Sequence, residues 1–194
     1  MKLAVIKYNA GNIQSVSFAL ERLGADFSIT DSAEEIKKAD KVIFPGVGEA
    51  STTMNFLREK KLDQVITSLK QPVLGVCLGM QLMCRHSEEN NTDCLGIFDL
   101  TVNKFIPGGN LKVPHMGWNQ LHVKDTWLDL ALQNQNVYFV HSFYVPVNEF
   151  TSAVTDYITP FSAALHRDNF YAVQFHPEKS AAAGELVLKS FLKL

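Results

Sequence analysis

Cys77 lies in a segment whose residue types could support nucleophilic chemistry. It is the central residue of Gly75-Val76-Cys77-Leu78-Gly79, which follows a short apolar run and leads into a segment of helical character from Met80 to Cys84. A sharp strand-to-helix turn exposes its central side chain, and glycines on either side let the strand and the helix approach closely. A cysteine at a helix N-terminus is biased towards the reactive thiolate. We therefore predict a cysteine nucleophile, although an isolated cysteine is more often a small buried apolar residue.

His176 and Glu178 could serve this nucleophile as a base and its orienting group. His176 follows the apolar run from Tyr171 to Phe175, and Pro177 stiffens the turn that leads to Glu178. Side chains two residues apart in an extended or turn segment point the same way. The carboxylate can then hold the imidazole in one tautomer and stabilise its charged form. A histidine and a glutamate in an ordinary surface turn are the alternative interpretation.

Acyl transfer to a thiol also needs backbone N–H groups that receive the oxyanion of the intermediate. Leu78, the first residue after Cys77, offers one such group. The second donor is expected from the loop Phe44-Pro45-Gly46-Val47-Gly48, where the glycines permit an unusual backbone path and Val47 N–H is the candidate. A simple turn before a helix near Glu49 would explain the same loop without any chemistry.

These residues must be positioned by a framework of strands and helices. Short, continuously apolar runs alternate with amphipathic segments in the first half of the chain, which is typical of βαβ units and of a parallel sheet covered on both faces. Shorter runs in the second half, broken by a hairpin turn at 107–110, indicate antiparallel strands. We predict strands at 3–7, 27–30, 41–44, 72–76, 100–105, 111–113, 119–123, 137–140, 151–155, 163–166 and 171–175, and helices at 12–23, around Ile36, and at 50–57, 62–69 and 181–192.

The expected fold is therefore α/β, with three layers, a mostly parallel central sheet and an antiparallel extension, in a single domain that spans residues 1–194. The special segments each follow a predicted strand: they are 9–12, 45–48, Cys77, 141–143 and 176–178. Because the carboxyl ends of the strands form the binding crevice of an open α/β sheet, we expect these segments to meet there.

The composition argues against several classes of protein. A formal net charge of −2 and a pI of about 6.3 give no basic footprint for nucleic acid or an anionic membrane. No apolar run approaches a membrane span, and the 3 cysteines form no disulfide framework. We therefore expect a soluble, cytoplasmic protein. Cys77, Cys84, His86 and Cys94 lack the paired spacing of a metal site, so no metal is predicted and Cys84 is expected in the core.

The strongest motifs resemble those of the class I glutamine amidotransferases. They are Gly-Val-Cys-Leu-Gly-Met-Gln at 75–81 and Phe-His-Pro-Glu at 175–178, and the resemblance runs through nearly the whole chain. It implies a flavodoxin-like fold without a cofactor. It also implies hydrolysis of L-glutamine to glutamate and ammonia by a triad of Cys77, His176 and Glu178.

Further motifs resemble one branch of that family, the glutaminase subunits of imidazole glycerol phosphate synthases in histidine biosynthesis. They are the segments 8–12, 45–48, 114–119 and 176–180. This branch implies a heterodimer with a cyclase subunit, a (β/α)₈ barrel that uses the ammonia to form imidazole glycerol phosphate and AICAR. Lys7 departs from the pattern, since the family generally has Asp there, and this concerns local contacts rather than the chemistry.

The resemblance also assigns residues to the substrate and to the partner. Glutamine is expected against Gly48, Gln81 and the main chain of Ser142 and Phe143. The partner is expected against Met116, Trp118, Asn119, Tyr138 and Lys179. Core packing is the alternative for Trp118 and Tyr138.

Three other interpretations stay open from the sequence. The first is a glutaminase subunit for pyridoxal phosphate or anthranilate synthesis. The second is a cysteine hydrolase on an α/β-hydrolase sheet, but in that class the acid precedes the histidine, whereas Glu178 follows His176. The third is a catalytically silent interaction module that retains the fold.

Overall fold

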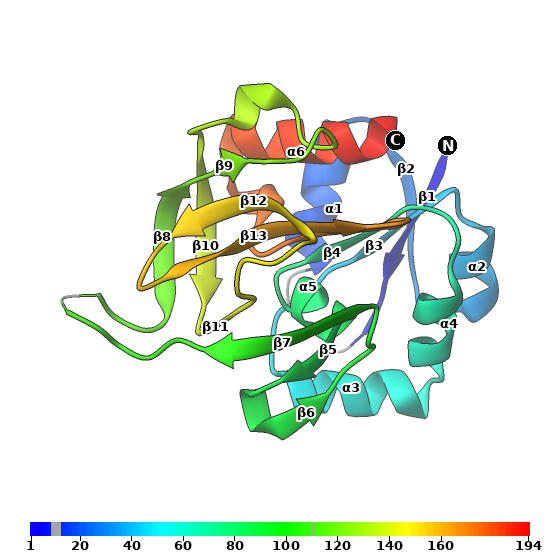
Figure 1. Ribbon diagram of the computed structural model, residues 1–194. Coiled ribbons are helices and arrows are strands. Elements are labelled where there is room, and N and C mark those ends of the chain that lie inside the picture. Colours follow the sequence, from blue (N-terminus) through cyan, green and yellow to red (C-terminus); the bar gives the residue numbers. More distant parts are fainter. Residues whose placement is uncertain (9–12, 110) are drawn as a thin grey trace.

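A computed structural model describes residues 1–8, 13–109 and 111–194. Its centre is an eight-stranded mixed sheet in the order β2-β1-β3-β4-β14-β13-β12-β9 (Figure 1). The first five strands of this order pair in parallel, which is the strand order of a flavodoxin-like fold. They are β1 (Lys2–Ile6), β2 (Asp26–Thr30), β3 (Lys41–Phe44), β4 (Val73–Val76) and β14 (Phe170–Val173).

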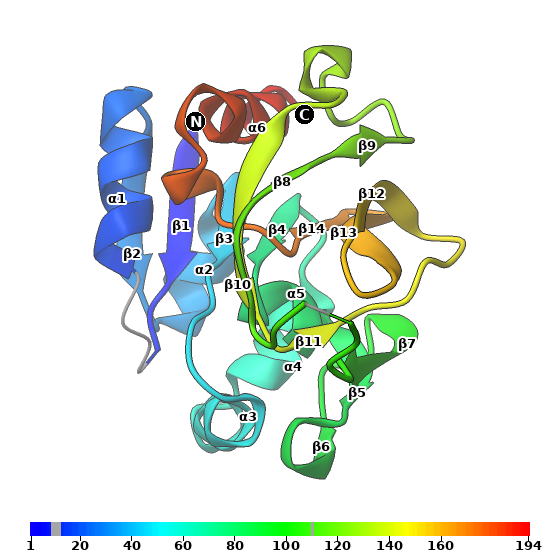
Figure 2. The ribbon, with the colours of Figure 1, turned by 90° about the vertical axis from the view of Figure 1, so that its left-hand side faces the viewer.

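Helices cover both faces of this sheet, and the alternation of strand side chains shows it. Leu3 and Val5 of β1 belong to one apolar cluster, whereas Ala4 and Ile6 belong to another. The first cluster includes residues of α1 (Ile13–Arg22) and α6 (Ala181–Lys193), which lie on the same side of the sheet (Figure 2). The second is covered by α2 (Ala33–Lys38), α3 (Ala50–Glu59), α4 (Leu62–Ser68) and α5 (Leu78–Met83). None of the described helices is long and apolar enough to cross a membrane.

The second half of the chain extends the sheet and adds two smaller ones. Figure 2 shows β8 and β10 as a curved ribbon that runs from α6 towards β11. The antiparallel extension consists of β13 (Pro160–Arg167), β12 (Thr151–Asp156) and β9 (His122–Val123). One smaller sheet consists of β10 (Asn136–His141) and β8 (His115–Gln120). The other contains, in this order, β11 (Phe143–Tyr144), β7 (Phe98–Lys104), β5 (Cys84–Ser87) and β6 (Thr92–Asp93). Short 3₁₀ turns are η1 (Glu89–Asn91), η2 (Leu130–Leu132) and η3 (Pro177–Lys179).

The α/β class, the mostly parallel core and its antiparallel extension are confirmed, but several boundaries were wrong. Residues 111–113 form no strand: Leu111 makes only an isolated bridge to Gly108, and Pro114, which has no N–H group, follows directly. Cys84 is not helical, because α5 ends at Met83 and the chain turns into β5, which pairs with β7. Strands β5, β6 and β11 were not predicted. The predicted segment 9–12 and residue 110 of the hairpin lie outside the described residues.

The glycines around Cys77 are required by very close backbone packing. A Cβ atom on Gly79 would collide with the carbonyl oxygen of Phe44, and one on Gly46 would collide with the backbone N of Gly79. A Cβ atom on Gly75 would lie 3.0 Å from the backbone N of Met80. The end of β3, the end of β4 and the start of α5 therefore touch through their main chains, as the flanking glycines predicted.

A similar contact fixes the His176–Glu178 turn. Gly184 of α6 lies against Pro177, and a Cβ atom there would collide with the carbonyl oxygen of Pro177. We expect Gly184→Ala to push η3 away from α6 and to lower the free energy of unfolding by about 1–3 kcal/mol, as overpacking does. Urea unfolding followed by circular dichroism measures this. The exposed Ala182→Gly in the same helix is the control, with a cost of about 1 kcal/mol. Wild-type stability in Gly184→Ala would contradict the contact.

Candidate active site

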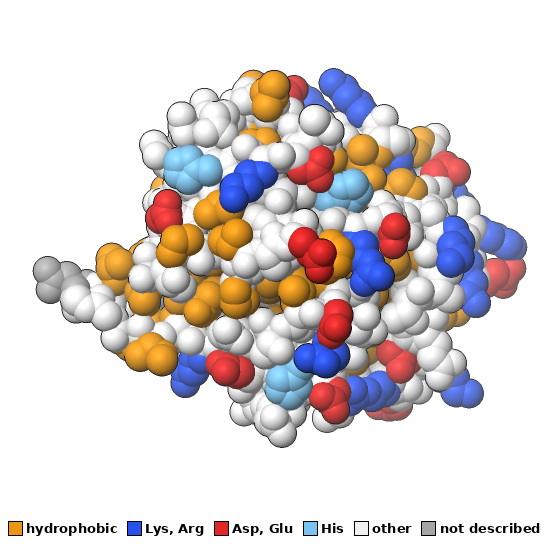
Figure 3. All heavy atoms as spheres, viewed as in Figure 1, with side chains coloured by type: hydrophobic (Ala, Val, Ile, Leu, Met, Phe, Trp, Pro, Cys, Tyr) orange, Lys and Arg blue, Asp and Glu red, His pale blue; other side chains and the backbone are white. Residues whose placement is uncertain are grey.

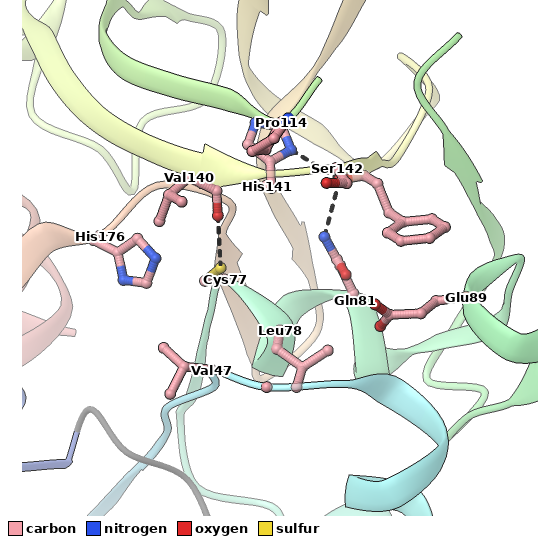
Figure 4. Close-up of a pocket in the computed structure, with 12 residues that line it drawn as sticks. Val47, Cys77, Leu78, Gln81, Glu89, Pro114, Val140, His141, Ser142 and His176 are labelled. Carbon is pink, nitrogen blue, oxygen red and sulfur yellow. Dashed lines mark hydrogen bonds between the residues drawn. The ribbon is translucent and has the colours of Figure 1, made fainter. Parts of the chain in front are cut away.

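Four of the predicted segments, at 45–48, Cys77, 141–143 and His176, contribute residues to one cavity of about 330 Å³ at the carboxyl ends of the parallel strands (Figure 4). Cys77 and His176 face each other across its floor. The lining also includes the residues expected for the oxyanion and the substrate, namely Val47, Gly48, Leu78, Gln81, Ser142 and Phe143. Glu178 is not in the lining, since it lies behind His176. Glu89, Pro114, Val140 and His141 complete the wall and had no assigned role.

Cys77 occupies a strained turn between β4 and α5. Its backbone has φ 54° and ψ −109°, a region that side-chain-bearing residues rarely adopt. The turn is held because Cys77 N–H donates to the carbonyl of Val173 at 2.8 Å and its own carbonyl accepts from Gln81 N–H at 3.2 Å. Such strain persists only where the surrounding structure enforces it, and it aims the thiol into the cavity (Figure 4).

His176 and Glu178 form a buried pair behind the cysteine. Nδ1 of His176 lies 2.7 Å from Oε1 of Glu178, and the two side chains are only 1% and 2% exposed. The backbone of His176 is fixed by a hydrogen bond from its N–H to the carbonyl of Tyr138 and by the Ser180 hydroxyl, which donates to the His176 carbonyl. Because the carboxylate occupies Nδ1, the ring presents Nε2 to Cys77.

The charge state of His176 follows from these neighbours. Burial works against a charged ring, but the negative sulfur of Cys77 and the bond to Glu178 outweigh it and raise the pKa of His176 to about 10. The arrangement therefore favours the imidazolium form of His176. That is the form from which a histidine can release a proton.

The loop before α3 does not present open oxyanion donors in this conformation. Leu78 N–H donates to the carbonyl of Gly46 at 3.3 Å. The hydroxyl of Tyr8 donates to the carbonyl of Pro45 at 2.6 Å, and Val47 N–H is directed at the same hydroxyl. Leu78 N–H is thus engaged by the loop itself, and Val47 N–H is directed at Tyr8.

One wall of the cavity is built from amide and carboxylate groups. The Nε2 group of Gln81 donates to the carbonyl of Phe143 and to Oε1 of Gln174, each at 3.0 Å. With both N–H bonds used, Gln81 can offer the cavity only its acceptor oxygen. Glu89 lies beside it (Figure 4) and accepts from Ala50 N–H at 2.8 Å. Burial raises the pKa of Glu89, although the hydrogen bond from Ala50 N–H acts in the opposite direction. Sequence reasoning missed Glu89, because nothing in its local pattern indicates that η1 folds over the cavity.

Behind this wall lies a histidine pair that the sequence left without a role. Nδ1 of His115 lies 3.0 Å from Nε2 of His141, and Nδ1 of His141 donates to the carbonyl of Phe143 at 2.8 Å. Burial lowers the pKa of His115 to about 4 and that of His141 to about 3. Both rings are therefore neutral, and the Phe143 bond fixes their tautomers.

Of the residues expected to face a partner, Met116, Trp118 and Tyr138 lie on β8 and β10, and Lys179 lies on η3. Met116 is 63% and Trp118 54% exposed, so Trp118 does not pack in the core. Tyr138 is half-buried and lies edge-on to Trp118 across the strand pair. Lys179 is exposed, whereas Asn119 turns inward and bonds to the carbonyl of Asp156. Apolar side chains also gather beside the loop that joins β7 to β8 (Figure 3).

Within the described parts of the chain, no three His, Cys, Asp or Glu side chains gather in a way that could hold a metal ion. The thiols of Cys84 and Cys94 are separate from the cavity, and burial raises the pKa of both. The chemistry available in the cavity is therefore that of one thiol and its histidine–glutamate pair.

Comparisons with known proteins identify the family of this chain. The class-I glutamine amidotransferase family matches residues 4–194, so the chain belongs to that family and is a glutamine amidotransferase. Within the family, it is 63% identical to the imidazole glycerol phosphate synthase subunit HisH of Bacteroides fragilis, with both chains fully covered. The subunit HisH of Haemophilus influenzae is 46% identical, with 100% of this chain and 98% of that protein covered.

Solved structures support the fold. A crystal structure of a glutamine amidotransferase superposes with a TM-score of 0.76 at 18% identity, covering 98% of this chain and 97% of the other. A structure of PurLQS from Thermotoga maritima gives a TM-score of 0.71 at 14% identity, covering 99% and 97%. At such identities the likeness concerns the fold alone.

The charge of His176 can be tested by removing the sulfur. In the wild-type protein the ring should stay protonated up to about pH 10, and in Cys77→Ala its pKa should fall, because the largest stabilising charge is gone. Side-chain NMR of ¹⁵N-histidine-labelled protein follows both titrations, and the signals of the distant His122 should be the same in the two proteins. An identical His176 titration in Cys77→Ala would contradict the coupling.

Proposed function

We propose that this chain is the glutaminase subunit of an imidazole glycerol phosphate synthase and that it hydrolyses L-glutamine through Cys77, His176 and Glu178. The observation that carries the proposal is the strained cysteine facing a buried histidine–glutamate pair in a small cavity. The identity to the HisH subunits supports the choice of pathway. The cytoplasm suits it, since all 3 cysteines are free thiols.

The reaction proceeds in two stages. Cys77 thiolate attacks the side-chain carbonyl carbon of glutamine, and His176 gives its Nε2 proton to the departing nitrogen, so that ammonia leaves and a glutamyl thioester remains. His176, now neutral, takes a proton from water as that water attacks the thioester. The C–S bond breaks, glutamate leaves, and Cys77 returns as thiolate. Glu178 holds the ring and stabilises its charged form throughout.

In this conformation, the backbone N–H groups that should receive the oxyanion already have other acceptors. The Gly46 carbonyl occupies Leu78 N–H, so we propose that the Gly46–Val47 peptide rotates. The rotation removes that carbonyl and turns Val47 N–H towards the cavity. Gly48, at φ 120°, and Gly46 give the backbone the freedom to do this. Hydrolysis is therefore slow until something stabilises the rotated loop.

The polar end of glutamine has matching partners on the opposite wall. Glu89 carboxylate and the Gln81 side-chain oxygen both accept, which suits the α-ammonium group of the substrate. Gly48 and the main chain of Ser142 and Phe143 also line the cavity and can hold its α-carboxylate.

The partner in this proposal is the cyclase subunit, a (β/α)₈ barrel bound as a heterodimer. It would dock on the surface formed by Met116, Trp118, Asn119, Tyr138 and Lys179, where large apolar side chains are exposed. Ammonia passes directly to the cyclase, which uses it to form imidazole glycerol phosphate and AICAR. This docking surface on β8 and β10 is close to the cavity, because the last two residues of β10, Val140 and His141, line the cavity.

Replacing the nucleophile separates the two half-reactions. In the complex reconstituted with the cyclase, Cys77→Ser should abolish glutamine-dependent synthesis, whereas synthesis from added ammonium salts should survive because the cyclase is unaltered. Product formation followed by absorbance or chromatography measures both. Retained glutamine hydrolysis in Cys77→Ser would contradict the proposed nucleophile, and failure to bind this cyclase would contradict the proposed pathway.

The role of Glu89 in binding predicts a change in affinity. Glu89→Gln keeps the shape of the side chain and removes its charge, so KM for glutamine should rise about ten-fold or more, the value of a charge-assisted hydrogen bond, with a smaller change in kcat. Steady-state glutaminase assays of the complex measure both constants. Glu88→Gln, a neighbouring carboxylate outside the cavity lining, is the matched control, and equal KM values in both variants would contradict the role.

A further inference from the structure

Gln174 is a buried amide beside the nucleophile that the mechanism above does not use. It follows β14 directly, its side chain is 0% exposed, and it lies two residues before His176. Its backbone N–H donates to the carbonyl of Ala163, which fixes its position at the end of the sheet. A fully buried amide must have its donors and acceptor satisfied, so the partners of this side chain are informative.

The orientation of Gln174 is set by a series of hydrogen bonds that begins at the Phe143 carbonyl. That carbonyl can only accept, and it receives bonds from His141 Nδ1 and from Gln81 Nε2. The Gln81 amide is therefore turned with its nitrogen towards Phe143. The second N–H bond of the same nitrogen goes to Oε1 of Gln174 at 3.0 Å.

This fixes the Gln174 amide in turn. Because its oxygen accepts from Gln81, its Nε2 group must point to the other side, and there it lies 3.7 Å from Sγ of Cys77. The same sulfur lies 4.0 Å from the carbonyl of Val140. The thiol form can donate to Val140, whereas the thiolate gains most from a donor such as Gln174, because a neutral sulfur is only a weak acceptor.

We propose that Gln174 is a positioning residue that acts in two directions at once. Through its nitrogen it holds the Cys77 sulfur and favours thiolate. Through its oxygen it accepts the second N–H group of Gln81 and so, together with the Phe143 carbonyl, keeps the Gln81 oxygen facing the substrate. The proposal rests on the proposed function for its link to glutamine, but its effect on Cys77 exists without substrate. It joins the nucleophile and the substrate-binding wall through one side chain.

Alkylation of Cys77 tests this without glutamine. The full-length protein is treated with iodoacetamide across a pH series, and the rate at the Cys77 peptide is read by mass spectrometry, which separates it from Cys84 and Cys94. Gln174→Met has nearly the same shape but no donor, so the pH at which alkylation is half-maximal should rise by about one unit. In the complex, kcat/KM for glutamine should fall about ten-fold.

Two further variants keep the test decisive. Gln174→Glu retains the acceptor for Gln81 but loses the donor and adds negative charge. Its alkylation midpoint should therefore rise more than that of Gln174→Met. This variant also replaces Gln174→Met in the test if the Met variant does not fold. Glu89→Gln changes the same cavity wall without removing any hydrogen bond of the Gln174 amide. It should raise KM for glutamine and keep the wild-type alkylation midpoint.

The result that overturns the proposal is an unchanged alkylation midpoint in both Gln174 variants, or an equal shift in Glu89→Gln, which would mean that any disturbance of the wall acts alike. These outcomes are independent of the proposed function. That function fails if Cys77→Ser still hydrolyses glutamine, whereas the alkylation series reports only on the sulfur and its neighbours.

Discussion

The main-chain contact between Gly46, Gly79 and Phe44 is the constraint on which the site depends. It brings the ends of β3 and β4 and the start of α5 so close that no Cβ atom fits at either glycine. Cys77 must then turn at a positive φ, with its thiol directed into the cavity. The same contact places the Gly46 carbonyl on Leu78 N–H. Tight packing thus directs the Cys77 thiol into the cavity and keeps Leu78 N–H engaged.

Burial has opposite consequences for the histidines around this turn because their neighbours differ. His115 and His141 contact each other, a carbonyl and aromatic rings, so burial is the dominant influence and both stay neutral. His176 is just as inaccessible, yet Glu178 on one nitrogen and Cys77 opposite the other favour its charged form. The neutral pair serves to orient amides and carbonyls. The charged ring can move a proton.

The sequence predicted those parts of the site that depend on local chemistry. The glycines beside Cys77 and the spacing of His176 and Glu178 indicated a strand-to-helix turn and a close pair, and both are present. The contributions of Glu89 and Gln174 depend on how η1 and β14 pack across the cavity, which no local pattern encodes. Strands β5, β6 and β11 were missed for the same reason, since β6 and β11 have 2 residues each and exist through pairing with distant strands.

The most direct test of the account is to trap the nucleophile with a chloroketone analogue of glutamine. The protein, alone and with the cyclase, is incubated with this electrophile, and its peptides are sequenced by mass spectrometry. We expect a single adduct on Cys77 that forms faster in the complex and is prevented by excess glutamine. An adduct on Cys84 or Cys94, or inactivation without any adduct on Cys77, would contradict the account.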